Sequence, residues 1–208
     1  MANPIKYHHG DLRAALVSAA LGVVERDGYE AISLRSLAEE LGVSRGAPYR
    51  HFNERNDLLA AVASHGFEIL AGFLRDIPKQ GYLPCKALVE SCRRFLEFAF
   101  TRRQHFRLMY ESGLLAEISR YPELQAAQNA AYAGISALYA AAVPALDARE
   151  LRLRMITMWV GLYGYAKVSQ TGILQDYMTL SLSSRDMEDA VLRAAIGESV
   201  FQRSQTES

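Results

Sequence analysis

The sequence predicts an all-α protein. Apolar residues recur at intervals of three and four along much of the chain, which is the spacing of one helix face, and alternating β-branched strand patterns are missing. With 208 residues, half of them apolar and 22% charged, the chain can bury the core of one medium or two small domains. The helical spacing is clearest in Leu12, Leu16, Ala19 and Val23, and in Cys85, Leu88, Cys92, Phe95 and Ala99.

Capping and stop residues divide the first part of the chain into four expected helices. Asp11 can cap the first helix, and Gly28 can end it in a left-handed conformation. Ser33 and Ser44 can cap the second and third helices, and Gly42 separates them. The four expected helices span residues 11–27, 33–42, 44–52 and 53–75.

The second part of the chain is expected to form a larger helical bundle. Ser183 and Asp186 have capping-box spacing before its last helix. We expect a first domain over residues 1–62 and a second over residues 63–208, with the boundary inside the fourth helix. The further expected helices span residues 84–102, 105–111, 122–143, 147–171 and 185–203.

Composition excludes several classes of protein. The formal net charge is zero, with 23 basic and 23 acidic side chains, so bulk charge does not indicate a nucleic-acid partner. Two cysteines cannot build a disulfide framework, and the segment MANPIKYHHG lacks the apolar stretch of a signal peptide, so we expect a cytoplasmic protein. The uncharged run Met155 to Ala166 is shorter than the roughly 20 residues of a membrane span. We expect it to be a buried helix, and we expect no membrane contact.

The segment SLRSLAEELG followed by VSRGAPYRHF has the pattern of a helix-turn-helix. Residues 42–51 contain Arg45, Arg50 and His51 and no acidic residue, so positive charge is concentrated where the neutral average hides it. Pro48 and Phe52 would face inward, because they are four residues apart. Proline removes one backbone donor, so we expect the third helix to be short and distorted at its start but not broken. Val43 would pack with these two residues onto Ile32, Leu37, Ala38 and Leu41.

The outward face of the third helix predicts contacts with DNA. Arg45 can donate two hydrogen bonds to guanine, which discriminates one base pair by roughly 1 to 3 kcal/mol. Small residues at 46 and 47 let the backbone approach the groove, whereas Tyr49 and His51 suit phosphate. An alternative interpretation is a compact packing unit with incidental surface arginines. The expected DNA-binding residues are Arg35, Ser44, Arg45, Gly46, Ala47, Tyr49, Arg50, His51 and Arg55.

Residues 8–62 resemble the DNA-binding domain of the TetR family of transcriptional regulators. They carry its helix-one run, its Gly-Val-Ser turn and its Tyr-x-His-Phe ending, and Arg55 keeps the charge where a lysine is common. The segments RLMYESGL and MWVGLYGYAKV further resemble the branch of this family with a Trp-His-Gly type C-terminal domain. Trp159 and Gly164 fit that signature, but Tyr163 stands where the histidine would be. A role of that histidine is therefore not transferred.

The resemblance implies a homodimer, formed through the last two helices, that binds a pseudo-palindromic double-stranded DNA operator. It also implies repression that a small-molecule effector relieves. Small residues on those helices would allow close packing across a dimer, although packing within one chain explains them nearly as well. They are Gly161, Gly164, Ala190, Ala194 and Gly197.

Aromatic and sulfur side chains of the second part can line an apolar effector cavity, with phenolic hydroxyls to orient the ligand. Each of them also suits an ordinary core. The candidate effector-binding residues are Phe95, Met109, Tyr110, Tyr132, Tyr139, Trp159 and Tyr163.

Enzyme motifs are missing from the sequence. It contains no P-loop, no Gly-x-Ser-x-Gly elbow and no His-Glu-x-x-His zinc helix. We therefore expect a protein that is not an enzyme and uses no cofactor or metal. Two alternatives stay open: an all-α enzyme acting on an apolar small molecule, and a helical interaction module that does not bind DNA.

Overall fold

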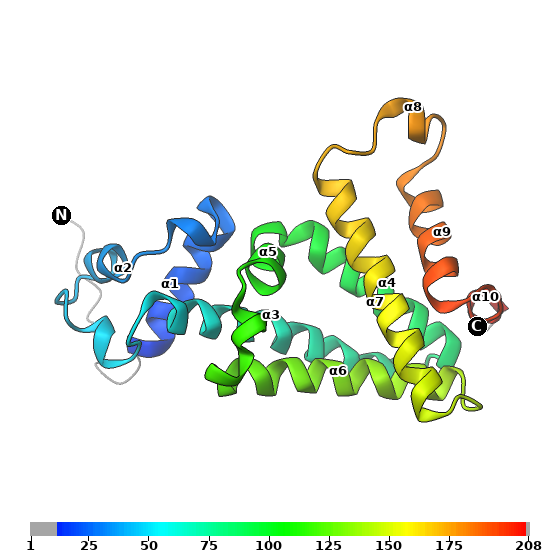
Figure 1. The fold of residues 1–208 in the computed structure, drawn as a ribbon, viewed down its shortest axis with the longest axis horizontal. Helices are drawn as coiled ribbons and strands as arrows, with labels where there is room; N and C mark the ends of the chain where they lie inside the picture. The colour runs from blue at the N-terminus through cyan, green and yellow to red at the C-terminus, as the bar shows by residue number, and fades with distance from the viewer. Residues whose placement is uncertain (1–11, 207–208) are drawn as a thin grey trace. The chain divides into compact units, whose positions relative to one another are not determined.

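The computed structural model describes residues 12–206, and this part of the chain is helical and contains no strand (Figure 1). The all-α prediction is confirmed. The described residues form two compact units, which we treat separately. The expected cap Asp11 lies outside the described residues.

The first unit holds the described residues up to Gly66 together with Arg103–Ala126. Within this unit α5 packs against α1 and η1. The functional division at residue 62 stays a prediction, because packing alone does not test it. The elements of this unit are α1 (Leu12–Asp27), η1 (Tyr29–Ala31), α2 (Leu34–Glu40), η2 (Pro48–Arg50), the first half of α3 (Arg55–Asp76), α5 (Arg103–Glu111), η4 (Leu114–Arg120) and the start of α6 (Pro122–Ala142).

The second unit holds Phe67–Arg102 and the described residues from Ala127 onward. In it α7 packs against α4 and α9, and α10 packs against α4 and α9. Besides the remainders of α3 and α6, its elements are η3 (Ile77–Gln80), α4 (Pro84–Thr101), α7 (Ala148–Gln170), α8 (Asp176–Thr179), α9 (Ser184–Ile196) and α10 (Glu198–Thr206).

Local capping chemistry explains several helix boundaries. The Ser33 hydroxyl accepts a hydrogen bond from the Ser36 amide at 3.4 Å, and Gly28 has a φ of 86° after α1, as predicted. The helix expected from Asn53 begins two residues later, at Arg55. The start of this helix is capped by Asp57, a residue of its own first turn. The Asp57 carboxylate accepts hydrogen bonds from the backbone amides of Asn53 and Glu54 at 2.9 and 3.2 Å.

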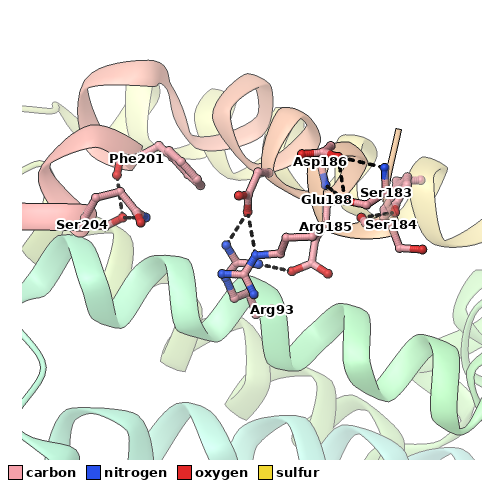
Figure 2. A network of polar contacts seen from close by, with 11 residues as sticks. Arg93, Ser183, Ser184, Arg185, Asp186, Glu188, Phe201 and Ser204 are labelled. Atoms are coloured by element: carbon pink, nitrogen blue, oxygen red, sulfur yellow. Dashed lines mark hydrogen bonds and ion pairs between the residues drawn. The ribbon is translucent and has the colours of Figure 1, made fainter. Parts of the chain in front are cut away.

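The last expected helix, residues 185–203, is divided into two helices in the structure. Gly197, with a φ of 94°, ends α9, and α10 begins at the next residue. The predicted capping box at the start of α9 is confirmed: Ser183 and Asp186 each accept a hydrogen bond from the other's backbone amide (Figure 2). The break is not visible in the spacing of apolar residues, because the buried residues Leu192, Ile196 and Val200 recur at intervals of four across it.

Charged side chains anchor α9 to α4. The guanidinium of Arg93 forms ion pairs with Glu188 and Asp189, and these three side chains are 15 to 24% exposed (Figure 2). Partial burial strengthens an ion pair relative to one in open solvent. This double pair therefore holds α9 in place beside the apolar contacts of the unit.

The run from Met155 to Ala166 is buried on one face only. Met155, Met158 and Leu162 face the core, whereas Ile156 and Val160 are more than half exposed. The prediction of a buried helix is therefore confirmed for one face and wrong for the other. Hydropathy alone does not distinguish a helix surrounded by its own chain from one with an uncovered apolar face.

One helical segment, Arg55–Gln80, is long and apolar enough to cross a membrane by length and composition. Most of its apolar window, 61%, is buried within the fold. The same length and composition occur in core helices of water-soluble proteins, so this segment is weak evidence for a membrane span among the described residues.

Candidate nucleic-acid interface

The predicted recognition segment has a buried side. Pro48 is buried and Phe52 is 2% exposed, and η2 packs against α1 and α2. The guanidinium of Arg13 lies over the Phe52 ring, with its carbon 5.4 Å from the ring centroid. The inward orientation predicted for Pro48 and Phe52 is confirmed. These two residues attach the segment to the helices before it.

The backbone of this segment is a chain of tight turns and not an α-helix. Ser44 O accepts from Ala47 N at 2.9 Å, and His51 N donates to Pro48 O at 3.0 Å, both over three residues. The third helix was expected to be short and distorted at its start. The structure has a short 3₁₀ element there and no α-helix, so the distortion affects the whole segment and not only its start. Pro48 has no amide to donate to the Ser44 carbonyl, so that carbonyl bonds one residue earlier and the segment tightens into the 3₁₀ turn Pro48–Arg50.

The opposite side of the segment is polar and exposed. Arg45, Arg50 and His51 are exposed, and Tyr49 is 53% exposed although it is a large aromatic residue. Ser44 and Gly46 are exposed as well, whereas Ala47 is half-buried. Guanidinium, imidazole and phenol groups are thus all accessible on this short segment, and they suit phosphates and base edges.

Glu39 is part of this surface, and the sequence analysis missed it. Its Oε1 lies 3.6 Å from Arg35 Nε and 3.4 Å from Arg45 Nη2, so one carboxylate oxygen faces two of the predicted DNA-binding arginines. All three side chains are exposed. The four-residue spacing from Arg35 was a signal for the first pair, but the pair with Arg45 depends on the turn between α2 and η2.

Arg55 has a different environment from the other predicted DNA-binding residues. It is half-buried, and its Nε donates to the carbonyl of Ile32 at 3.0 Å. Its Nη2 donates to the carbonyl of Tyr29. Arg55 therefore ties the start of α3 to η1, at the entry to the helix-turn-helix.

Helix α5 holds the same region from the other side. Arg107 Nη2 donates to Glu30 at 2.8 Å, and its guanidinium carbon lies 5.5 Å from the centroid of the Tyr29 ring. The pKa of Glu30 is lowered, chiefly by a hydrogen bond from its own backbone and also by the positive charge of Arg107. Burial raises the pKa of Tyr29. The short element η1 is thus held by arginines from both α3 and α5.

A close contact joins α5 to α3. His105 is fully buried, its Nε2 lies 2.8 Å from the carbonyl oxygen of Val62, and its ring stacks parallel to that of His65 with centroids 6.0 Å apart. Next to this pair, Met109 packs against Gly66. An added Cβ at Gly66 would lie only 2.3 Å from Met109 Sδ. Glycine permits this approach because any side chain would occupy the space of the methionine.

The candidate effector-binding residues are divided between the two units. Met109 and Tyr110 lie in the first unit and the other five in the second. Tyr139 is buried, its hydroxyl donates to the carbonyl of Ile196 at 3.4 Å, and burial raises its pKa. Phe95, Tyr110 and Tyr163 are half-buried, whereas Tyr132 and Trp159 are exposed. The rings of Trp159 and Tyr163 stack at 5.2 Å on α7.

The fold and the exposed basic turn together define a helix-turn-helix DNA-binding protein. Residues 16–62 match the family described as bacterial regulatory proteins, tetR family, and residues 88–195 match the tetracyclin repressor-like C-terminal domain. The second match covers more than half of the chain. The chain therefore belongs to the TetR family of transcriptional regulators, which are not enzymes.

Individual relatives agree with this family. The HTH-type nicotine-responsive transcriptional repressor HdnoR of Paenarthrobacter nicotinovorans is 38% identical over 69 residues, 33% of this chain and only 34% of HdnoR. An HTH-type transcriptional regulator of Mycobacterium tuberculosis is 23% identical over 185 residues, 89% of this chain and 80% of that protein.

Solved structures share the fold along most of its length. A protein from Rhodococcus sp. RHA1 has a TM-score of 0.73 and 26% identity, covering 96% of this chain and 98% of its own. RolR in complex with resorcinol has a TM-score of 0.65 and 17% identity, covering 92% of each chain. The similarity to RolR is a similarity of fold.

Proposed function

We propose that this TetR-family protein is a homodimeric repressor that binds a pseudo-palindromic operator and is released by a small, largely apolar molecule. The observation that carries the DNA-binding part is the two-sided turn 44–52. Its apolar side, Pro48 and Phe52, attaches it to the helices, and its basic side is exposed. A locally positive turn that is attached to the fold by buried residues, in a neutral protein, suits recognition of one DNA groove.

Within this proposal the DNA-facing residues divide into two groups. Arg45 reads a base, and Tyr49, Arg50 and His51 contact phosphates. The exposed residues Arg35, Ser44 and Gly46 and the half-buried Ala47 complete the predicted set. Arg55 acts as a positioning residue, because its guanidinium donates to backbone carbonyls of the motif.

Selection of bound fragments from genomic DNA, followed by titration at several salt concentrations, tests the proposal. The double variant Arg45→Ala/Arg50→Ala should lose specific binding and show a shallower salt dependence, because fewer phosphate counterions are released. Arg75→Ala/Lys79→Ala removes the same charge from exposed residues of the second unit and should bind normally. Equal binding by both double variants, or no preference of the wild type for any fragment over random DNA, overturns the proposal.

The dimer part of the proposal is supported by the uncovered face of α7. Leu153, Ile156 and Val160 follow one another at helical spacing and are 44 to 60% exposed. A Cβ added at Gly164 would meet no atom within 4 Å, whereas one at Gly161 would touch Ala195 of the same chain. Gly161 thus serves packing within the chain, and Gly164 leaves room for a second copy. A row of this kind in contact with water is typical of an interface.

For the effector, two similar proteins set the direction. HdnoR is nicotine-responsive, and RolR was solved with resorcinol. Derepression by a factor of ten requires the effector to prefer the DNA-incompetent state by about 1.4 kcal/mol. The single tryptophan, Trp159, stacked on Tyr163, provides an intrinsic fluorescence reporter for screening small ring compounds. Assignment to the Trp-His-Gly branch stays a prediction, because Tyr163 replaces its histidine.

A further inference from the structure

The segment between α7 and α9 carries an unusual number of exposed apolar side chains. We call residues 171–183, which include α8, the arm. It connects the ends of α7 and α9 (Figure 1). Tyr177 is 75% and Leu180 81% exposed, and three more large side chains of the arm, Ile173, Met178 and Leu182, are at least half exposed. Such a cluster marks a surface that another molecule covers.

The composition of the arm selects a protein partner. Asp176 is its single charged residue, and it contains no lysine or arginine. A membrane-surface segment or a nucleic-acid contact would use basic residues to meet phosphates. Depletion of charge together with exposed aromatic and methionine side chains is instead the composition of a protein interface core.

The backbone of the arm is held in a conformation that a free loop would avoid. Leu180 has a φ of 38°, and among residues 12–206 it is the one residue other than glycine with a positive φ. The conformation is closed by hydrogen bonds of 2.7 Å from Leu180 N to Asp176 O and from Leu182 N to Thr179 O. Positive φ at a branched apolar residue is costly and persists where contacts impose it. Leu180 has few such contacts within its own chain.

We infer that the arm docks on a second copy of this chain, and this inference rests on the proposed homodimer. The arm follows directly after α7, the helix whose exposed row Leu153, Ile156 and Val160 supports the dimer. It then leads into α9, which the Arg93 ion pairs hold to α4. In a two-fold dimer each copy would present one arm to the other, so every apolar contact would occur twice.

Site-specific cross-linking of a cysteine placed in the arm, at its most exposed apolar residue, tests this inference. The native thiols do not interfere, because Cys85 and Cys92 are 2% and 1% exposed and burial raises the pKa of Cys92 to about 12. Leu180→Cys is labelled with a maleimide photocrosslinker, mixed with isotopically heavy chain and irradiated. Peptides that join light and heavy chains are expected. Cross-links confined to one chain, or none, overturn the inference.

A paired substitution measures the contribution of the arm to association. Tyr177→Ser/Leu180→Ser should raise the dimer dissociation constant at least tenfold in sedimentation equilibrium. Tyr82→Ser/Leu83→Ser is the matched control, because it removes the same two residue types from exposed positions outside the arm and should leave the constant unchanged. If the wild type is monomeric, the proposed dimer and the inference both fail. If the wild type is a dimer and the arm variant has the same dissociation constant, only the inference fails.

Discussion

Substitution of Gly66 by alanine would place a methyl group in the contact between α3 and α5. The new Cβ would lie 2.3 Å from Met109 Sδ and 3.0 Å from His105 Nε2. Both distances are well below the roughly 3.5 to 4.0 Å at which nonbonded heavy atoms attract. His105 is fully buried and Met109 nearly so, which leaves little room for either to move aside.

The magnitude follows from two opposing effects. Overpacking a dense core costs about 1 to 3 kcal/mol. Replacing glycine by alanine inside a helix contributes about 1 kcal/mol in the stabilising direction. Gly72, in the same helix, is the matched control, because an added Cβ there would meet only the end of the flexible Arg75 side chain, at 3.9 Å. Gly72→Ala should therefore show only the stabilising effect. The free energy of unfolding of Gly66→Ala should be about 1 to 3 kcal/mol lower than that of Gly72→Ala.

Urea unfolding followed by far-UV circular dichroism, at one protein concentration, measures this difference. The double variant Gly66→Ala/Met109→Ala closes a thermodynamic cycle, and we expect a favourable coupling of about 1 kcal/mol or more, because truncating Met109 vacates the space of the new methyl. A Gly66→Ala protein as stable as Gly72→Ala, or a cycle without coupling, would refute the packing argument.

Three further predictions concern other parts of the molecule. Glu39→Gln should strengthen operator binding by about two- to fivefold in anisotropy titrations. The substitution releases Arg35 and Arg45 from surface ion pairs, which are worth up to about 1 kcal/mol. The control Glu40→Gln should have less effect. Ser183→Ala should lower the unfolding free energy by about 1 kcal/mol at neutral pH. The pKa of Asp186 is lowered by its hydrogen bonds from Ser183, so the stabilisation from this carboxylate is present above about pH 4 and is lost as the pH falls through the lowered value. In urea unfolding at acid pH, the difference in unfolding free energy between wild type and Ser183→Ala should therefore be smaller than at neutral pH. A difference that does not change with pH would contradict this account. Thiol reagents in mildly alkaline buffer should modify Cys92 only after unfolding, since burial raises its pKa to about 12, and rapid modification of the native protein would disprove this.

Much of the DNA-binding motif was predictable from short-range pattern. The four-residue interval between Pro48 and Phe52 placed both on the inner side, and the structure buries both. Ser33 and the pair Ser183 and Asp186 act as predicted, because capping depends on residues within one helical turn. The helix capped by Ser44 was expected to be distorted by Pro48 at its start only, whereas the structure has tight turns and a 3₁₀ element over the whole segment.

Contacts between distant segments were not predictable in the same way. Residues 103–126 join the N-terminal helices, and Gly66 meets Met109 from a helix more than 40 residues away. Glu39 and Arg45 meet across a turn whose geometry no single-residue preference specifies. The candidate effector residues were chosen by side-chain type, and side-chain type does not indicate whether a residue such as Trp159 is buried or exposed.

The sequence by itself determined the helical class, most helix boundaries, the basic turn and its family, because periodicity, caps and a long local motif act over a few neighbouring residues. Only the tertiary structure decided which arginines face solvent, that Arg55 is tied to backbone carbonyls, and that α7 and the arm leave apolar side chains uncovered. Burial and ion pairing are set by which distant segments meet. That is a property of the packed chain, and local spacing does not contain it.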